Sequence, residues 1–274
     1  MPASYAHYRF GRDVLTFLPE SIRGEIKEYR SLYNIGLHGP DILFYYKPVK
    51  SNAITKLGND MHDQPALQFF ENAADLYLKT DNKAALKAYL FGFICHFALD
   101  STCHPYIEKM TDISRLSHTE LESELERYFM EKDRIDPAGY VPVKHITASS
   151  YQAQVIAPCF SLSEKEIRQS LKGMIASHKL LHAPGKLKRS ILYAGLKATG
   201  NYDYMQGLIM KPEANPNVSG YLTQLDQLYK EAISLATSLI QKYDSVLNSD
   251  EKEFPEEFHR TFGSGPDWEH LSID

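Results

Sequence analysis

Cysteine is scarce in this sequence, and its use excludes a disulfide-stabilised fold. The chain of 274 residues has three cysteines, and an odd number cannot form a closed disulfide framework. Cys95 and Cys103 each lie beside a candidate metal ligand, but neighbouring residues on a helix point about 100° apart. We therefore interpret both as small buried apolar side chains rather than as ligands.

Long hydrophobic runs are also missing. No stretch approaches 18 consecutive apolar residues, so no transmembrane helix is expected. The N-terminal sequence MPASYAHYRF has no apolar region behind a basic start, which is the pattern of a secretory signal. Together these absences predict a soluble, cytoplasmic protein.

Positive charge is in slight deficit. The 30 Lys and Arg residues against 35 Asp and Glu residues give a net charge of −5. This balance argues against non-specific binding to duplex nucleic acid, which needs clusters of Lys and Arg to neutralise phosphates. At 43% hydrophobic residues the chain can bury the core of one large domain or of two small ones.

The alternation of apolar and polar residues that marks β-strands is nearly absent, and helical periodicity dominates. The pattern predicts one all-α domain over residues 1–274, with a metal cleft between helices and a polar C-terminal tail from about residue 249. Asp81 is a plausible N-cap for a buried central helix, and Ser117 with Glu120 forms a capping box. Helices are expected at 8–17, 20–34, 66–79, 82–100, 117–132, 163–182, 185–198 and 219–247, with a loop at 134–160.

The most informative stretch runs from residue 96 to residue 122. It contains HFALDSTCHP and SHTELE, in which potential ligands follow one another at i, i+4. Four residues advance the direction of a helical side chain by about 40°, so each such pair projects from one face. Imidazole nitrogens and carboxylate oxygens on one face are ligands that Zn²⁺ prefers. The residues with this spacing are His96, Asp100, His104, His118 and Glu122.

Other potential ligands are less distinctive. Asp41 ends the tripeptide GPD, whose turn either aims the carboxylate inward or lets it cap the following turn. His62 and His7 are isolated and by themselves unremarkable. His178 and His182 form another i, i+4 pair without a carboxylate, and a solvated or partner-satisfied face is favoured for them. His38 and His145 fall into no pattern.

The order of these motifs resembles the zinc-dependent phospholipase C family, which shares its all-α fold with zinc-dependent fungal single-strand nucleases. The specific parts are GPD, GFICHFALDSTCHP and SHTELE, so the resemblance in motifs extends to about residue 130. It implies a cleft that binds two to three Zn²⁺ ions. The implied ligands are Asp41, His62 and His96 for one ion; His104, His118 and Glu122 for a second; and Asp100 and His7 for a third.

The third ion of the family is completed by the N-terminal residue. Pro2 is small, so we expect Met1 to be removed and Pro2 to supply its α-amino group and carbonyl. One departure concerns the central helix, because Asp100 and His104 are four residues apart where secreted members of the family have six. A site with two metals or with weak occupancy is the alternative.

The resemblance implies hydrolysis of a phosphodiester, with a phospholipid headgroup as substrate and metal-bound hydroxide as nucleophile. Asp41 is the candidate for both ligand and proton acceptor. Phe44 and Tyr45 are candidate substrate-binding residues, although with Tyr46 they are more simply explained as core. The alternatives are a single-strand nuclease, which needs aromatic side chains for base stacking, and a non-catalytic metal-stabilised domain. A transient contact with a membrane surface is compatible with the lipid substrate.

Overall fold

The computed structural model describes residues 4–114, 116–249 and 253–272. These residues form twelve α-helices and contain no strand beyond one isolated bridge between Pro65 and Thr261. The prediction of an all-α fold is confirmed. The helices are α1 (Ser4–Leu15), α2 (Glu20–Glu28), α3 (Arg30–Gly36), α4 (Ala53–Asp63), α5 (Leu67–Lys79), α6 (Lys83–Ser114), α7 (His118–Lys132), α8 (Ser150–Ile156), α9 (Glu164–Leu181), α10 (Lys186–Ala198), α11 (Tyr202–Met205) and α12 (Ser219–Asn248).

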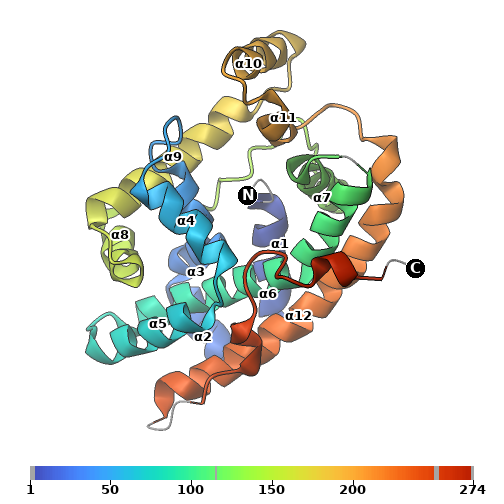
Figure 1. Ribbon diagram of the computed structural model, residues 1–274. Helices are drawn as coiled ribbons and strands as arrows, with labels where there is room; N and C mark the ends of the chain where they lie inside the picture. Colours follow the sequence, from blue (N-terminus) through green and yellow to red (C-terminus); the bar gives the residue numbers. More distant parts are fainter. Residues whose placement is uncertain (1–3, 115, 250–252, 273–274) are drawn as a thin grey trace.

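Helix α6 runs through the middle of the molecule, and the other long helices are arranged around it (Figure 1). It packs mainly against α3 and α12, and also against α1, α5 and α7. Most of its residues between Ala85 and Met110 are buried. The helix is apolar nearly all round, as its sequence predicted, because neighbours cover every side of it.

Two glycines allow α3 and α6 to approach closely. A Cβ atom on Gly36 would lie 2.2 Å from the carbonyl oxygen of Tyr89, and one on Gly92 would lie 2.1 Å from the carbonyl oxygen of Tyr33. No side chain fits at these distances. The glycines therefore set the backbone contact that fixes α6 against the N-terminal helices.

Several helix boundaries differ from the predictions. The predicted helix 20–34 is broken at Tyr29 into α2 and α3. Helix α6 begins at Lys83, which places Asn82 rather than Asp81 before it, and it continues past residue 100 through Pro105 to Ser114. A proline removes one backbone hydrogen bond, but burial of the following turns keeps the helix intact. The predicted loop 134–160 contains α8, and α4 and α11 were not predicted.

The C-terminal segment after α12 is not peripheral. Its composition is polar, yet Phe258 and Phe262 are fully buried against the aromatic core around α5 and α6. The segment also pairs with the chain near the end of α4, where Gly263 donates a backbone hydrogen bond to His62 and Ala66 donates one to Arg260. These contacts return the end of the chain to the region of the predicted ligands.

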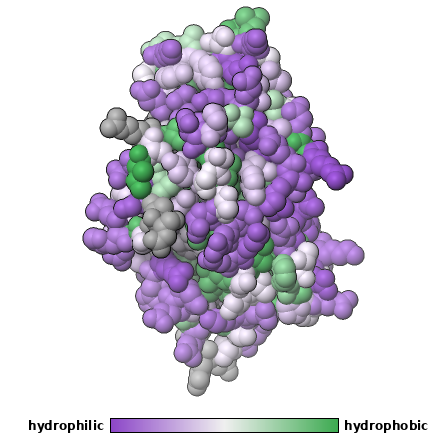
Figure 2. Space-filling view, turned by 90° about the vertical axis from the view of Figure 1, so that its right-hand side faces the viewer, coloured by the Kyte–Doolittle hydropathy of each residue, from purple (hydrophilic) through white to green (hydrophobic). Residues whose placement is uncertain are grey.

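The face of the molecule in Figure 2 is covered mostly by hydrophilic residues, with hydrophobic ones in small groups. Among the described residues, no helix has both the length and the apolar character needed to span a bilayer. The predicted burial of Cys95 and Cys103 is confirmed.

Candidate metal centre

The candidate ligands lie on four helices and one 3₁₀ turn that meet at one side of α6. The 3₁₀ turn Gly39–Tyr45 carries Asp41, and α4 carries His62. Helix α1 contributes His7, and α7 contributes His118 and Glu122 at its first two turns. The eight described candidates form three sets, and each set contains at least one residue of α6.

The first set brings together residues that are far apart in the sequence. Asp41, His62 and His96 offer ligand atoms that all lie within 4.8 Å of one another. The Nε2 atom of His62 lies 3.1 Å from Oδ1 of Asp41. The turn aims the Asp41 carboxylate inward, which decides between the two interpretations of GPD that the sequence left open.

The second set consists of His7, His96 and Asp100, and it shares His96 with the first. The Oδ1 atom of Asp100 lies 3.1 Å from Nε2 of His7, and the Oδ2 atom of the same carboxylate lies 3.2 Å from Nε2 of His96 and 3.8 Å from Nδ1 of His104. His7, His96 and Asp100 are all buried. One carboxylate thus faces three imidazoles, which suits a bridging or shared ligand.

The third set consists of His104 from the C-terminal part of α6 and of His118 and Glu122 from the start of α7. Nε2 of His104 lies 3.5 Å from Oε1 of Glu122, and Nε2 of His118 lies 3.3 Å from the same oxygen. The short spacing of Asp100 and His104 therefore does not turn His104 away from this set. The capping box of Ser117 and Glu120 holds the first turn of α7, and with it His118, in place.

The distances fit a zinc ion. Two ligands at the usual zinc bond length of about 2.0–2.1 Å in tetrahedral geometry lie roughly 3.3–3.5 Å apart. The five closest histidine–carboxylate pairs among the candidate ligands lie between 3.1 and 3.5 Å. In the described part of the chain, neither ring nitrogen of the fully buried His96 makes a hydrogen bond, since the 3.2 Å contact of its Nε2 with Asp100 does not have hydrogen-bond geometry. A metal ion would satisfy this otherwise costly group.

Three of the histidines are oriented by a second partner on the ring atom facing away from the set. Nδ1 of His62 is 2.7 Å from the carbonyl oxygen of Gly58. Nδ1 of His104 is 2.7 Å from the carbonyl oxygen of Phe262. Nδ1 of His118 is 3.3 Å from a carboxylate oxygen of Glu108. Such partners fix the tautomer and leave Nε2 for the metal. Sequence reasoning missed all three partners.

The protonation states of His96, Asp41 and Glu122 agree with ligation. Burial lowers the pKa of His96 to about 3, so its imidazole is neutral at physiological pH. Burial alone would raise the pKa of Asp41, but the hydrogen bond from His62 and the proximity of His96 lower it. The pKa of Glu122 is lowered in the same way by His118 and His104 despite burial. Neutral imidazoles and ionised carboxylates are the forms that bind metal. Despite burial, Glu122 and Glu108 raise the pKa of His118 to about 9, and Asp41 raises the pKa of His62, so zinc would displace a proton at these two rings.

Gly39 is required by the position of His96. Its φ angle is +46°, in the left-handed region that favours glycine, and a Cβ atom there would lie 2.1 Å from Cδ2 of His96. The first residue of GPD therefore leaves room for a ligand from a different helix.

The remaining predictions fall around the centre. Pro2 and Met1 lie outside the described residues. The rings of Phe44 and His62 stack with centroids 5.3 Å apart, and Tyr45 is buried near His178. His38 and His145, which fall into no sequence pattern, are joined by a contact of 2.8 Å between their Nε2 atoms.

A cavity of about 680 Å³ lies near the centre. None of the eight candidate ligands lines it, but Phe44, which stacks on His62, and Glu126, one turn after Glu122 on α7, do. Its wall includes Phe44 and Tyr45, four loop residues between 137 and 142, and residues of α7, α9, α10 and the segment around α11. His178 and His182 also line it. His178 is satisfied by the carbonyl oxygen of Met174 and by the Ser4 hydroxyl, which agrees with the partner-satisfied alternative for this residue.

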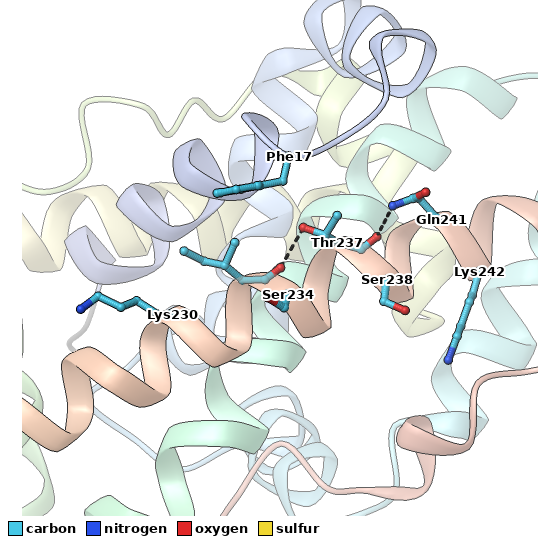
Figure 3. A pocket seen from close by; sticks show the side chains of 8 residues that line it. Phe17, Lys230, Ser234, Thr237, Ser238, Gln241 and Lys242 are labelled. Atoms are coloured by element: carbon cyan, nitrogen blue, oxygen red, sulfur yellow. Dashed lines mark hydrogen bonds between the residues drawn. The ribbon is translucent and has the colours of Figure 1, made fainter.

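A second hollow, also of about 680 Å³, lies on the outer face of α12 (Figure 3). Phe17 covers one side of it, and the α12 side chains that line it include Lys230, Thr237 and Lys242. None of the candidate ligands lines this hollow. It is separate from the centre.

Comparison with known proteins agrees with the geometry. The family model described as zinc dependent phospholipase C matches residues 6–181. No curated protein and no solved structure matches the chain. The matched part contains the eight described candidate ligands and excludes α10, α12 and the C-terminal segment. Since the match covers more than half of the sequence, the chain belongs to the zinc-dependent phospholipase C family.

Proposed function

We propose that this protein hydrolyses phosphodiesters with bound zinc and that its substrate is a phospholipid cleaved at the headgroup. One observation carries the proposal, which is the convergence of three histidine–carboxylate sets on α6 at distances that suit zinc. The family assignment gives the same chemistry at a coarser level. A non-catalytic domain would have no need for a substrate-sized cavity near the metal centre.

Zinc bound here supplies Lewis-acid chemistry, since it polarises phosphoryl oxygens and lowers the pKa of bound water toward neutrality. The protein holds up to three ions through the eight described ligands. Asp41 was predicted to act as ligand and as proton acceptor. Its lowered pKa favours the ligand role, because a carboxylate that is strongly acidic accepts a proton poorly.

The cavity wall supports a lipid substrate over single-stranded nucleic acid. Leucine, methionine and proline side chains dominate it, with Leu181, Met130 and Met210 as examples. A platform for nucleic acid would combine exposed aromatic rings with basic residues along a groove. Tyr45 is buried instead, and Phe44 is stacked on His62. Both aromatic residues are therefore proposed to form part of the wall of the lipid site.

The experiment combines metal analysis with a substrate panel. Purified protein reconstituted with zinc should contain two to three ions per chain and should hydrolyse phosphatidylcholine or p-nitrophenyl phosphodiesters in preference to single-stranded DNA. Chelation should abolish the activity. Glu122→Ala and His104→Ala should each lose about one ion and more than about 100-fold of the activity, because each removes one of the three protein ligands of its ion.

His259→Ala serves as the matched control, because His259 is an exposed histidine whose Nδ1 contacts only the local carbonyl of Glu256 among the hydrogen bonds of the described chain. It should keep both zinc and activity. Fewer than one ion after reconstitution, or activity that survives exhaustive chelation, contradicts the proposal. A clear preference for single-stranded DNA moves the assignment to the nuclease alternative. The ligand role of Pro2 stays a prediction.

A further inference from the structure

Helix α10 has an apolar face that nothing in the described structure covers. None of its thirteen residues is buried. Leu187 is 77% exposed and Ile191 is 62% exposed. They are four residues apart, and Ala194 and Ala198 continue the same outward strip at i+7 and i+11 from Leu187. The opposite side, with Leu192 and Leu196, is partly buried toward the protein.

Basic residues flank this strip. From Ile167 to Tyr202 the sequence contains no Asp or Glu, although the whole chain has more acidic than basic residues. Lys186 and Lys197 fall on one side of the strip. Lys188 falls on the other side, where its Nζ atom donates to the backbone carbonyls of Lys179 and His182. The seven basic residues of the acid-free stretch are Arg168, Lys172, Lys179, Lys186, Lys188, Arg189 and Lys197.

The cationic helix lies beside the mouth of the cavity. Leu180, at the end of α9, is 60% exposed and also lines the cavity, as does Leu196 of α10. In Figure 1 α10 forms the end of the molecule beyond α9 and α11, and in Figure 2 hydrophobic residues lie at that same end among hydrophilic ones. Lys188 and Arg189 fix the helix there by donating to backbone carbonyls of residues 179–184.

We propose that α10 and the end of α9 form the surface by which this protein docks on an anionic lipid bilayer. An outward apolar strip bordered by lysines is the arrangement of a helix lying in a membrane interface, where the apolar side chains enter the acyl boundary and the amines reach the phosphates. This surface includes Leu180, which is exposed and also lines the cavity. This surface deepens the proposed function, but its binding can be measured without turnover.

The test is co-sedimentation of the zinc-loaded protein with vesicles of phosphatidylcholine alone and of phosphatidylcholine mixed with phosphatidylglycerol. We expect tighter binding to the anionic vesicles and weakening of that binding by salt. The double variant Leu187→Ser/Ile191→Ser should bind at least about ten-fold more weakly, since it removes the apolar insertion. Lys179→Gln/Lys186→Gln should weaken binding to anionic vesicles by about five-fold for each lysine and should leave binding to phosphatidylcholine vesicles unchanged.

The control is Ile113→Ser, which changes a side chain of 55% exposure at the end of α6. It should bind vesicles as the unaltered protein does. All variants should hydrolyse a water-soluble p-nitrophenyl phosphodiester at the unaltered rate, while the α10 variants should lose hydrolysis of vesicle lipid. If the protein proves inactive on every diester, the proposed function fails while the vesicle-binding result still decides the docking surface.

Three outcomes would overturn the docking proposal. One is absence of binding to anionic vesicles, or binding that Leu187→Ser/Ile191→Ser leaves unchanged. Another is a dimer in light scattering that the same double variant dissociates, which would assign the strip to a second copy of the chain. The last is binding of a single-stranded oligonucleotide that is lost with the lysine variant but kept with the leucine and isoleucine variant.

Discussion

Helices α6 and α10 have opposite relations to the rest of the molecule. Helix α6 is covered on all sides and carries three of the candidate ligands, whereas α10 has no buried residue. Figure 1 shows one in the middle of the fold and the other at its end. A helix of thirteen residues is marginal by itself in water, because most helical stability in proteins comes from tertiary packing. The difference shows that α6 is held by the core, whereas α10 has few contacts that hold it.

The same contrast separates the candidate metal centre from the proposed docking surface. Residues that must hold a fixed geometry, such as His96 and Asp100, are placed where packing allows no movement. Residues proposed to meet a fluid surface, such as Leu187 and Ile191, are on a helix tied to the body by a few contacts. Substitutions in the two regions should therefore differ in size and in what they affect.

The largest expected effect is on folding. Phe93→Ala removes a fully buried ring of α6 that stacks on Phe69 at a centroid distance of 4.0 Å. It should lower the free energy of unfolding by about 3–5 kcal/mol. Leu187→Ala on α10 should change it by less than about 0.5 kcal/mol. Urea denaturation followed by circular dichroism measures both, and equal losses would erase the distinction between the two helices.

A smaller effect is expected where a loop meets α6. Gly39→Ala forces a side chain into the left-handed region and against His96. The strain should cost about 1–3 kcal/mol of unfolding free energy, and zinc content should fall because the His96 ring must move. Gly24→Ala is the matched control, since no atom lies within 4 Å of its Cβ position in α2. There we expect a gain of about 0.5–1 kcal/mol and unchanged zinc.

The next prediction concerns pH and the wall of the cavity. Burial raises the pKa of Glu126 from 4.5 to about 8. A raised folded-state pKa gives a contribution to stability that is complete below pH 4.5 and is lost as pH rises through about 8. Zinc-free protein should therefore lose stability between about pH 4.5 and pH 8, and Glu126→Gln should reduce that loss by about 1–2 kcal/mol. Urea denaturation measures the free energy of unfolding at each pH. If it falls equally with pH in the unaltered protein and in Glu126→Gln, Glu126 does not cause the loss.

The smallest effect should come from an outer partner of the centre. Glu108 lies near the end of α6 and contacts Nδ1 of His118 at 3.3 Å. Glu108→Gln should weaken zinc binding by about ten-fold without unfolding the protein, since loss of such a partner leaves the ligands in place. Competition with a fluorescent chelator gives the affinity. Glu131→Gln, an exposed change on α7, should leave the affinity unaltered, and a similar loss there would mean that Glu108 has no special role.

Local patterns predicted much of the fold and of the centre. The i, i+4 spacing of His96 with Asp100 and of His118 with Glu122 needs only a helix to bring these side chains together. The capping box at Ser117 likewise depends on neighbours three residues apart. The break at Tyr29 and the continuation of α6 through Pro105 were missed, because tertiary packing outweighs local preference at both places.

The sequence by itself determined an all-α chain, the helix faces that carry ligands and the segregation of basic residues around α10. Only the tertiary structure decided that Asp41 turns toward His62, that the carbonyl of Phe262 orients His104 across 158 residues, and that His38 pairs with His145. It also decided which of the two apolar sides of α10 is partly covered. The physical reason is the sequence distance over which each effect acts. Helical periodicity involves residues a few positions apart, whereas these contacts depend on how whole helices pack.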